Sequence, residues 1–212
     1  MLIQILVDNI NSWIIPYAEE LSHQLEYQGH EAYLIHNHDK VKEGDILCLL
    51  SCEKIFKELH LNKHNLVIHE SDLPEGKGWS PLTWQILQGK NKIPVTLFEA
   101  SKEVDAGAVY VKEFIQLKGH ELLDEIKHKQ GIITKKLIID FVEKYPSIEA
   151  LPQKGESTYY PKRTPKDSEL DVEKSIKDQF DLLRVCDNER YPAYFKFKGE
   201  KYFIKIYKDD RV

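Results

Sequence analysis

Residues that could carry out proton-transfer chemistry lie in two short segments of the chain. His69 ends an apolar run over residues 65–69, and a loop with two prolines and two glycines, residues 70–81, follows directly. Further along the chain, Asp105 opens the turn Asp105-Ala106-Gly107. A histidine changes its charge near neutral pH, so it can both take and give a proton, and a neighbouring carboxylate would orient its ring. His69 and Asp105 are therefore candidate catalytic residues.

The elements that must position these residues follow an alternating pattern, which is typical of a parallel sheet covered by helices. Strands are predicted over residues 2–7, 31–35, 45–50, 65–69, 95–99 and 108–114. Helices are predicted over residues 13–28, with Ser12 as N-cap, and over 53–59, 82–89 and 121–144, with an interruption at Gly131. The predicted fold class is α/β, a Rossmann-like, mostly parallel sheet with helices on both faces. His69 then lies at the carboxyl end of a strand, where open α/β sheets bind ligands.

The composition changes after Tyr145-Pro146, which predicts two units. Residues 1–150 form the Rossmann-like domain, and residues 151–212 form a small α+β subdomain. In the second unit we expect an extended segment over 151–167 that lies over the first domain, a helix over 171–185 and a terminal β-hairpin built around Lys198-Gly199-Glu200. The edge of that hairpin offers a surface for a homodimer, and the sequence leaves the oligomeric state open.

Composition and charge exclude several classes of function. The 212 residues carry a formal net charge of −5, whereas proteins that bind nucleic-acid phosphates normally have a basic excess, so no nucleic-acid partner is expected. No apolar run approaches the roughly 20 residues of a membrane span, so no membrane partner is expected. Three cysteines without a secretion signal indicate reduced thiols and a cytoplasmic location. The chain contains neither G-x-G-x-x-G after its first strand nor a P-loop, so neither a dinucleotide site nor a P-loop nucleotide site is expected. The spacing His36-x-His38 lacks further ligands, so no metal is expected.

The segment that begins at His69 resembles the 10-formyltetrahydrofolate-dependent formyltransferases, which include methionyl-tRNA formyltransferases and sugar N-formyltransferases. That family has Asn-x-His at a strand end, then Pro-Ser-Leu-Leu-Pro, an Arg-Gly turn, a closing proline, Gly-Val-Thr and Asp-x-Gly. The matching positions here are His69, Ser71-Asp72-Leu73-Pro74, Lys77-Gly78, Pro81, Pro94-Val95-Thr96 and Asp105-Ala106-Gly107. The stretch from Tyr159 to Asp167, with Arg184 and Tyr191-Pro192-Ala193, is similar to the sugar branch.

The resemblance implies transfer of a formyl group from 10-formyltetrahydrofolate to the amine of a nucleotide-linked amino-deoxysugar, in a reaction without a metal. In such a reaction one group must stabilise an oxyanion and another must take a proton, and His69 suits both tasks. Asp105 would orient the ring of His69 and favour its protonated form. The residues implied for the folate are Leu50, Ser51, Cys52, Lys54 and Asp105, and those implied for the acceptor are Asn9, Ser71, Lys77, Gly78, Trp79, Lys162 and Arg163.

One position departs from the family pattern. The catalytic asparagine of the family, two residues before the histidine, is here Val67, which cannot donate a hydrogen bond. Loss of one oxyanion donor costs on the order of 3–4 kcal/mol in acyl transfer. Asn65 points to the same strand face and is included as a catalytic candidate, and Asn9, Ser71 or a backbone N–H of the glycine loop are other candidate donors.

Other interpretations stay open. The alternatives for function are a formyltetrahydrofolate deformylase, a methionyl-tRNA-type formyltransferase, a non-catalytic binder of folate or sugar nucleotides, and a tailoring domain for aminoacyl carriers. Ser71 with His69 and Asp105 could suggest a hydrolase, but the G-x-S-x-G elbow is missing. Trp79 could anchor the loop rather than stack on a ligand. Lys162 and Arg163 could hold a diphosphate or lie solvated.

Overall fold

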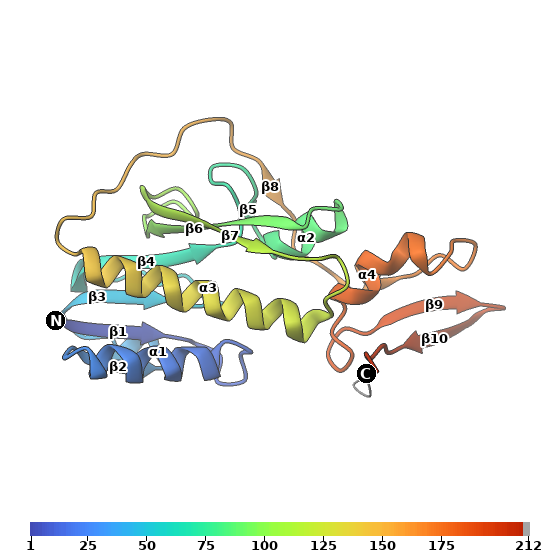
Figure 1. Ribbon diagram of the computed structural model, residues 1–212, viewed down its shortest axis with the longest axis horizontal. Coiled ribbons are helices and arrows are strands. Elements are labelled where there is room, and N and C mark those ends of the chain that lie inside the picture. The colour runs from blue at the N-terminus through green and yellow to red at the C-terminus, as the bar shows by residue number, and fades with distance from the viewer. Residues whose placement is uncertain (210–212) are drawn as a thin grey trace.

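The computed structural model describes residues 1–209, and within that range six strands form one central sheet with helices packed against it (Figure 1). The strands are β1 (Leu2–Leu6), β2 (Glu31–Ile35), β3 (Gly44–Leu49), β4 (Asn62–His69), β6 (Lys92–Glu99) and β7 (Val109–Gln116). Their order across the sheet is β2-β1-β3-β4-β6-β7. Strands β1 to β4 pair in parallel, while β6 is antiparallel to both of its neighbours. The predicted α/β class with a mostly parallel sheet is confirmed.

Two long helices cover one face of the sheet, α1 (Ile15–Tyr27) and α3 (Leu123–Lys144). Alternate residues of β1 point to this face, where Ile3 and Ile5 are fully buried in the main core. Helix α3 runs without the interruption predicted at Gly131. That glycine serves packing instead, because a Cβ atom at position 131 would lie 2.4 Å from the ring of Tyr17 on α1.

The opposite face of the sheet carries short 3-10 turns, η1 (His38–Lys40) and η2 (Leu59–Leu61). Leu6 projects to this face and packs in a smaller apolar cluster with Phe56. The helix predicted over residues 53–59 is wrong. The N–H groups of Glu53 and Lys54 donate to the carboxylate of Asp8, and residues 55–58 then run in irregular structure that buries Phe56 in the cluster with Leu6.

The predicted N-cap of the first helix is also wrong. Ile14 occupies that position, and no side chain accepts a hydrogen bond there. The N–H of Ser12 instead donates to the carbonyl of Asn9 in a preceding turn. Pro16 in the first turn reduces the need for a cap, because proline has no N–H to satisfy.

An extended strap connects the sheet to the C-terminal unit and crosses over the sheet domain, as predicted for residues 151–167 (Figure 1). It ends in the 3-10 turn η3 (Pro165–Ser168). Within the strap, β8 (Tyr159–Tyr160) pairs in parallel with β5 (Lys77–Gly78), which lies in the glycine loop just before α2 (Pro81–Leu87). The strap therefore fixes the loop that follows His69.

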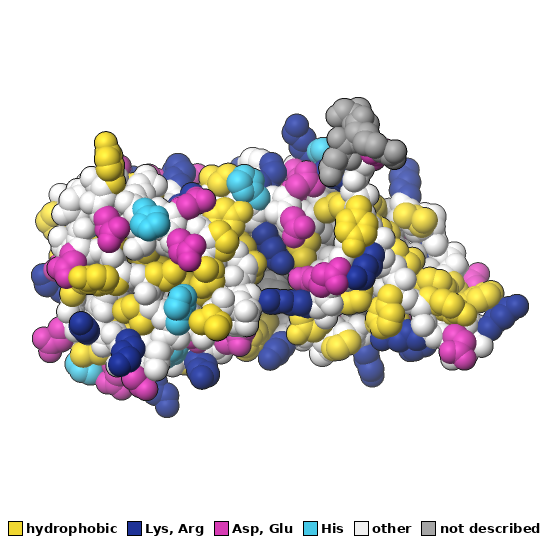
Figure 2. Space-filling view, turned by 90° about the horizontal axis from the view of Figure 1, so that it is seen from below, with side chains coloured by type: hydrophobic (Ala, Val, Ile, Leu, Met, Phe, Trp, Pro, Cys, Tyr) yellow, Lys and Arg dark blue, Asp and Glu magenta, His cyan; other side chains and the backbone are white. Residues whose placement is uncertain are grey.

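The C-terminal unit contains the predicted hairpin and a shorter helix than predicted. Its elements are η4 (Lys177–Gln179), α4 (Phe180–Val185), β9 (Ala193–Phe197) and β10 (Glu200–Ile204). The helix predicted to begin near Asp171 is wrong in its first part, because the Gln179 side chain accepts from the Asp171 N–H and donates to its carbonyl, which holds a turn. Figure 2 shows hydrophobic side chains exposed over this end of the molecule, and Phe197, Tyr202 and Phe203 of the hairpin are among the exposed residues.

Two further findings concern residues 1–209. No helix in this range combines the length and the apolar character that crossing a membrane requires. The same range contains no group of three or more His, Cys, Asp and Glu side chains that could hold a metal ion. The two histidines bond different groups: His36 bonds the carbonyl of Val7, and His38 bonds the carboxylate of Asp8.

Candidate active site

A cavity of about 690 Å³ opens at the carboxyl ends of β3 and β4, in the size range of small-molecule sites. One side is the strand-end wall, which we define as residues 67–70 and 78–79 with Asp105. The facing side is the loop wall, residues 49–56. Helix α3 closes the cavity with residues that include Lys127 and Gln130. The parallel strands thus place the cavity where the position of His69 predicted a ligand site.

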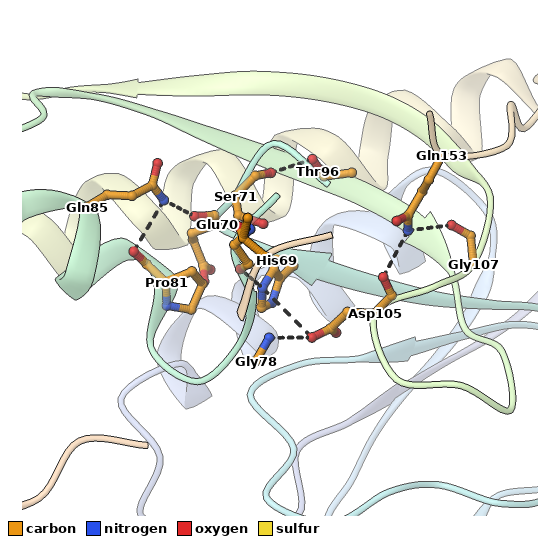
Figure 3. A network of polar contacts seen from close by, with 12 residues as sticks. His69, Glu70, Ser71, Gly78, Pro81, Gln85, Thr96, Asp105, Gly107 and Gln153 are labelled. Carbon is orange, nitrogen blue, oxygen red and sulfur yellow. Dashed lines mark hydrogen bonds and ion pairs between the residues drawn. The ribbon is translucent and has the colours of Figure 1, made fainter. Parts of the chain in front are cut away.

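His69 is 7% exposed and its ring is held from one side. Its Nε2 lies 2.9 Å from the carbonyl oxygen of Gly76 and 3.9 Å from Oδ2 of Asp105 (Figure 3). A carbonyl oxygen can only accept, so Nε2 carries a proton. Within residues 1–209 no hydrogen bond engages Nδ1, and this second ring nitrogen is the one left for chemistry.

Asp105 is fixed by contacts on both its side chain and its backbone. Its Oδ2 accepts from the N–H of Gly78 at 2.9 Å, and its carbonyl accepts from Nε2 of Gln153 at 2.9 Å (Figure 3). The backbone of Asp105 has a φ of 54°, in the left-handed region that aspartate tolerates better than most residues. Gly107 is required next to it, because a Cβ atom there would lie 1.6 Å from the carbonyl oxygen of Glu99. The structure therefore brings His69 and Asp105 together as predicted from the sequence.

Gln153 and Thr158 are positioning residues that the sequence did not reveal. Both lie in the strap, where Gln153 holds the Asp105 turn and the hydroxyl of Thr158 accepts from the N–H of Gly76 at 2.8 Å. The strap has little periodicity, and its stretch with a family resemblance begins at Tyr159, after both residues, so nothing local indicates that their side chains reach the site.

The loop wall contains all four of the side chains predicted to bind folate there, and they line the cavity: Leu50, Ser51, Cys52 and Lys54. The carboxylate of Asp8 fixes this wall, since it accepts from the N–H groups of Glu53 and Lys54 at 2.8 and 2.9 Å. Burial, with the nearby Asp8 charge, raises the pKa of the Cys52 thiol to about 12. Cys52 is therefore a packing group and not a nucleophile at neutral pH.

The predicted acceptor-binding residues divide into two sets. Gly78 and Trp79 line the cavity, and the ammonium group of Lys162 lies 4.7 Å from the centre of the Trp79 ring, which is 49% exposed. Lys77 is only 5% exposed and points toward Tyr159, outside the cavity. Arg163 also lies outside, because its guanidinium donates to the carbonyl of Asp167.

The predicted substitutes for the family's asparagine do not reach the reacting centre. Val67 lines the cavity at the expected position, whereas the side-chain amide of Asn65 donates to the carbonyl of Leu59 at 2.8 Å and lies outside the cavity. Asn9 likewise lies outside the cavity, where it bonds Glu53. The hydroxyl of Ser71, 2% exposed, is buried without a partner among residues 1–209.

Glu70 is the cavity residue whose importance the sequence did not indicate. One oxygen of its carboxylate accepts from Nε2 of Gln130 on α3 at 2.6 Å. Burial raises the pKa of Glu70, although the neighbouring His69 charge and the Gln130 amide act in the opposite direction. An acidic residue after the motif histidine is easily taken for a surface charge, and its burial depends on α3, which is distant in sequence.

Comparisons with known proteins agree with this arrangement. The family model described as formyl transferase matches residues 17–142. A methionyl-tRNA formyltransferase from Sulfurihydrogenibium sp. is 30% identical over 169 residues, which are 76% of this chain and 53% of that protein. The chain spans about half the length of the curated relatives it matches.

Solved structures share the fold over nearly the whole chain. A methionyl-tRNA formyltransferase from Clostridium thermocellum has a TM-score of 0.82 at 22% identity and covers 100% of this chain and 95% of its own. A sugar N-formyltransferase from Shewanella sp. has a TM-score of 0.72 at 16% identity and covers 99% and 98%. At these identities the likeness shows the fold.

Proposed function

The chain belongs to the formyl transferase family, and from that premise we propose that it transfers a formyl group from 10-formyltetrahydrofolate to the amine of a nucleotide-linked amino-deoxysugar. One observation carries the proposal: His69 lies in the cavity wall with Asp105 3.9 Å away, while its Nδ1 has no partner among residues 1–209. Formyl transfer to an amine needs a hydrogen-bond donor for the developing oxyanion, and an imidazolium held by a carboxylate supplies one.

His69 acts as the oxyanion donor through Nδ1. Val67 has no polar group, the N–H of Gly78 is engaged by Asp105, and the other candidates lie outside the cavity. The protonated ring therefore places Nε2–H toward Gly76 and Asp105, and Nδ1–H toward the formyl oxygen. Removing one such donor typically costs a factor of 10²–10³ in rate.

The formyl donor is a substrate, and its binding is assigned to the loop wall. Leu50 and Ile55 provide apolar surface, and Lys54 adds a positive charge that suits an anionic tail. The cavity volume of about 690 Å³ lies in the range of sites for small-molecule ligands. Trp79 and Lys162, at the edge of the cavity, offer an aromatic face and a cation to a nucleotide acceptor.

Charge favours a sugar nucleotide over tRNA as the acceptor. The net charge of −5 opposes the phosphate contacts on which tRNA binding depends. A relative and a structural neighbour that are methionyl-tRNA formyltransferases, however, favour methionyl-tRNA as the second candidate. A sugar N-formyltransferase is also among the structural neighbours.

The test is incubation with 10-formyltetrahydrofolate and a panel of nucleotide-linked 3-amino and 4-amino deoxysugars, with methionyl initiator tRNA and water as competing acceptors. Product mass is followed, and His69→Ala is the control. We expect a gain of one formyl group on a sugar nucleotide, lost in the variant. Formylation of the tRNA without any sugar product would show that methionyl-tRNA, and not a sugar nucleotide, is the acceptor. Release of formate alone would indicate a deformylase.

A further inference from the structure

Glu70 is a carboxylate in the cavity wall that forms no salt bridge within residues 1–209, although the charge of the neighbouring His69 ring acts on it. Nε2 of Gln130 donates to one oxygen of its carboxylate, which leaves most of the roughly four lone-pair positions of a carboxylate open. Within residues 1–209 no Lys, Arg or His nitrogen forms an ion pair with it. Glu70 is half-buried and lines the cavity, and a carboxylate without a salt bridge at such a place is suited to binding a cationic ligand.

The groups that face Glu70 come from three elements. His69 precedes it at the end of β4, Asp105 approaches from the turn between β6 and β7, and Gln130 bonds it from α3, where Lys127 lines the same cavity. Lys127 is engaged elsewhere, because its Nζ lies 3.5 Å from Oδ2 of Asp187. Burial and the Asp105 charge raise the pKa of Glu70, and His69 and Gln130 oppose that rise.

His69 cannot carry out both tasks of the reaction at once. Its Nε2–H is held by the carbonyl of Gly76, and Nδ1 must keep its proton to stabilise the oxyanion, since Val67 offers no donor. The acceptor amine is protonated in water near neutral pH, and an ammonium group has no lone pair with which to attack. A second group must therefore bind the ammonium and remove its proton.

We propose that Glu70 is this group, a catalytic residue that binds the acceptor's ammonium through its open carboxylate positions and takes its first proton. This inference rests on the function proposed above and names the acceptor class as a primary ammonium. The proton moves from nitrogen to the Glu70 carboxylate, and the neutral amine forms a C–N bond to the formyl carbon. As the bond from that carbon to N10 of the folate breaks, the second nitrogen proton passes to N10, and Glu70 returns its proton to solvent.

The kinetic test compares Glu70→Gln with wild type on the sugar nucleotide that the panel identifies. The glutamine keeps an oxygen for Gln130 but cannot accept the proton, so kcat/KM near pH 7 falls about a hundredfold. The loss shrinks as pH rises, because the amine then arrives neutral, and the variant comes within about tenfold of wild type near pH 9. A merely structural role would give a loss that does not change with pH.

Two further variants sharpen the result. Glu75→Gln removes an exposed carboxylate from the same loop and leaves the pH profile unchanged. Gln130→Leu removes a donor that favours the ionised form of Glu70. In the pH profile of kcat/KM for Gln130→Leu, the acidic limb, where activity falls because Glu70 becomes protonated, therefore moves to higher pH. A hundredfold loss in Glu75→Gln, or an unshifted limb in Gln130→Leu, would contradict the assignment.

A binding measurement separates this inference from the proposed function. Calorimetry compares dTDP-linked 4-amino-4,6-dideoxyglucose with its 4-hydroxy counterpart. We expect about tenfold tighter binding of the amine by wild type, with the preference lost in Glu70→Gln. Preference without formyl transfer would overturn the proposed function and keep the ammonium site. Transfer with unchanged kinetics in Glu70→Gln would overturn the inference alone. If the protein shows no formyl transfer and no preference for the amine, both the proposed function and the inference are overturned.

Discussion

The two walls of the cavity are built in different ways. The glycine loop that leads into the strand-end wall is tied to distant segments by four consecutive N–H groups, which donate to the strap and to Asp105: those of Gly76, Lys77, Gly78 and Trp79. In the loop wall, the carboxylate of Asp8 holds two consecutive N–H groups, and the thiol of Cys52 donates to the carbonyl of Leu6 at 3.3 Å. Ile55 in that wall is 67% exposed.

This difference suits the strand-end wall to catalysis and the loop wall to substrate binding. Groups that stabilise a transition state must be fixed before the substrate arrives, and a loop tied at four consecutive residues meets that need. The hydrogen bonds of the loop wall are made by residues 50–54, and beyond them the exposed Ile55 can move onto a ligand. Variants in the strand-end wall should therefore change kcat, and variants in the loop wall should change KM.

The largest expected effect comes from removing the imidazole of His69. His69→Gln should lower kcat about a thousandfold with little change in KM for the folate, because the lost hydrogen bond forms mainly in the transition state. Steady-state kinetics with 10-formyltetrahydrofolate as varied substrate measure the split. His23→Gln, an exposed site on α1, is the matched control. A change confined to KM would show that His69 binds substrate and does no chemistry.

The next effect tests whether the strap holds the strand-end wall. Gly78 has a φ of +93°, and a Cβ atom there would lie 2.6 Å from the carbonyl oxygen of Tyr160. Gly78→Ala should therefore lower the free energy of unfolding by about 2–4 kcal/mol through strain and displacement of β8, and kcat should fall with it.

Gly89→Ala is the control for that substitution. Its φ of +80° is similar, but no atom lies within 4 Å of the added Cβ, so the strain of the left-handed backbone remains without the clash. We expect a loss of about 1 kcal/mol in urea unfolding and normal kinetics. Equal losses in the two variants would show that the contact with the strap contributes nothing.

The sequence predicted those parts of the site that local patterns encode. Strand-end position, the glycine loop and the Asp-x-Gly turn identified His69 and Asp105, and the structure places them 3.9 Å apart. Apolar runs identified all six strands of the sheet, because alternation and β-branched composition are local signals. The helix interruption predicted at Gly131 was wrong because the glycine serves a long-range contact: it leaves room for the ring of Tyr17, which is distant in sequence.

What local patterns missed depends on long-range contacts. Residues 53–59 are not helical as predicted, since Phe56 is buried against Leu6, which is distant in sequence. The side-chain amide of the catalytic candidate Asn65 donates to the carbonyl of Leu59. Strand alternation correctly placed Asn65 on the face of His69, but it could not show that a neighbouring turn takes its amide. Glu70 shows the converse, because a charged residue gained its role through Gln130 on α3.

A smaller effect tests the loop wall. Asp8→Asn keeps one acceptor oxygen but loses the charge and one of the two oxygens that hold the N–H groups of Glu53 and Lys54. Loss of hydrogen bonds to a charged group costs about 1.5–3 kcal/mol, and part of it should appear as a roughly tenfold higher KM for 10-formyltetrahydrofolate. The kcat should stay within about twofold of wild type.

Glu58→Gln is the control for Asp8→Asn, because Glu58 is an exposed residue of the same connection. It should leave both constants unchanged. If Asp8→Asn lowers kcat and leaves KM alone, the loop wall takes part in the chemistry and the two walls do not have separate roles.

The smallest effect concerns the approach to α3, which closes the cavity between the two walls. Burial acts against the ionised carboxyl of Glu121, but the N–H groups of Lys118 and Gly119 bond it and hold its pKa at about 2. A pKa depressed in the folded state stabilises the protein above the unfolded value of about 4.3, and this contribution is lost as pH falls toward 2. Glu121→Gln should therefore lower the free energy of unfolding by about 1–2 kcal/mol at pH 7.

Urea titrations at several pH values test this origin, because the difference in unfolding free energy between Glu121→Gln and wild type should shrink between about pH 4 and 2. Glu143→Gln, at the exposed far end of α3, is the control and should unfold with the same free energy as wild type. A difference that persists unchanged at low pH would assign the loss to packing, and the charge of Glu121 would then have no part in holding α3 against the cavity.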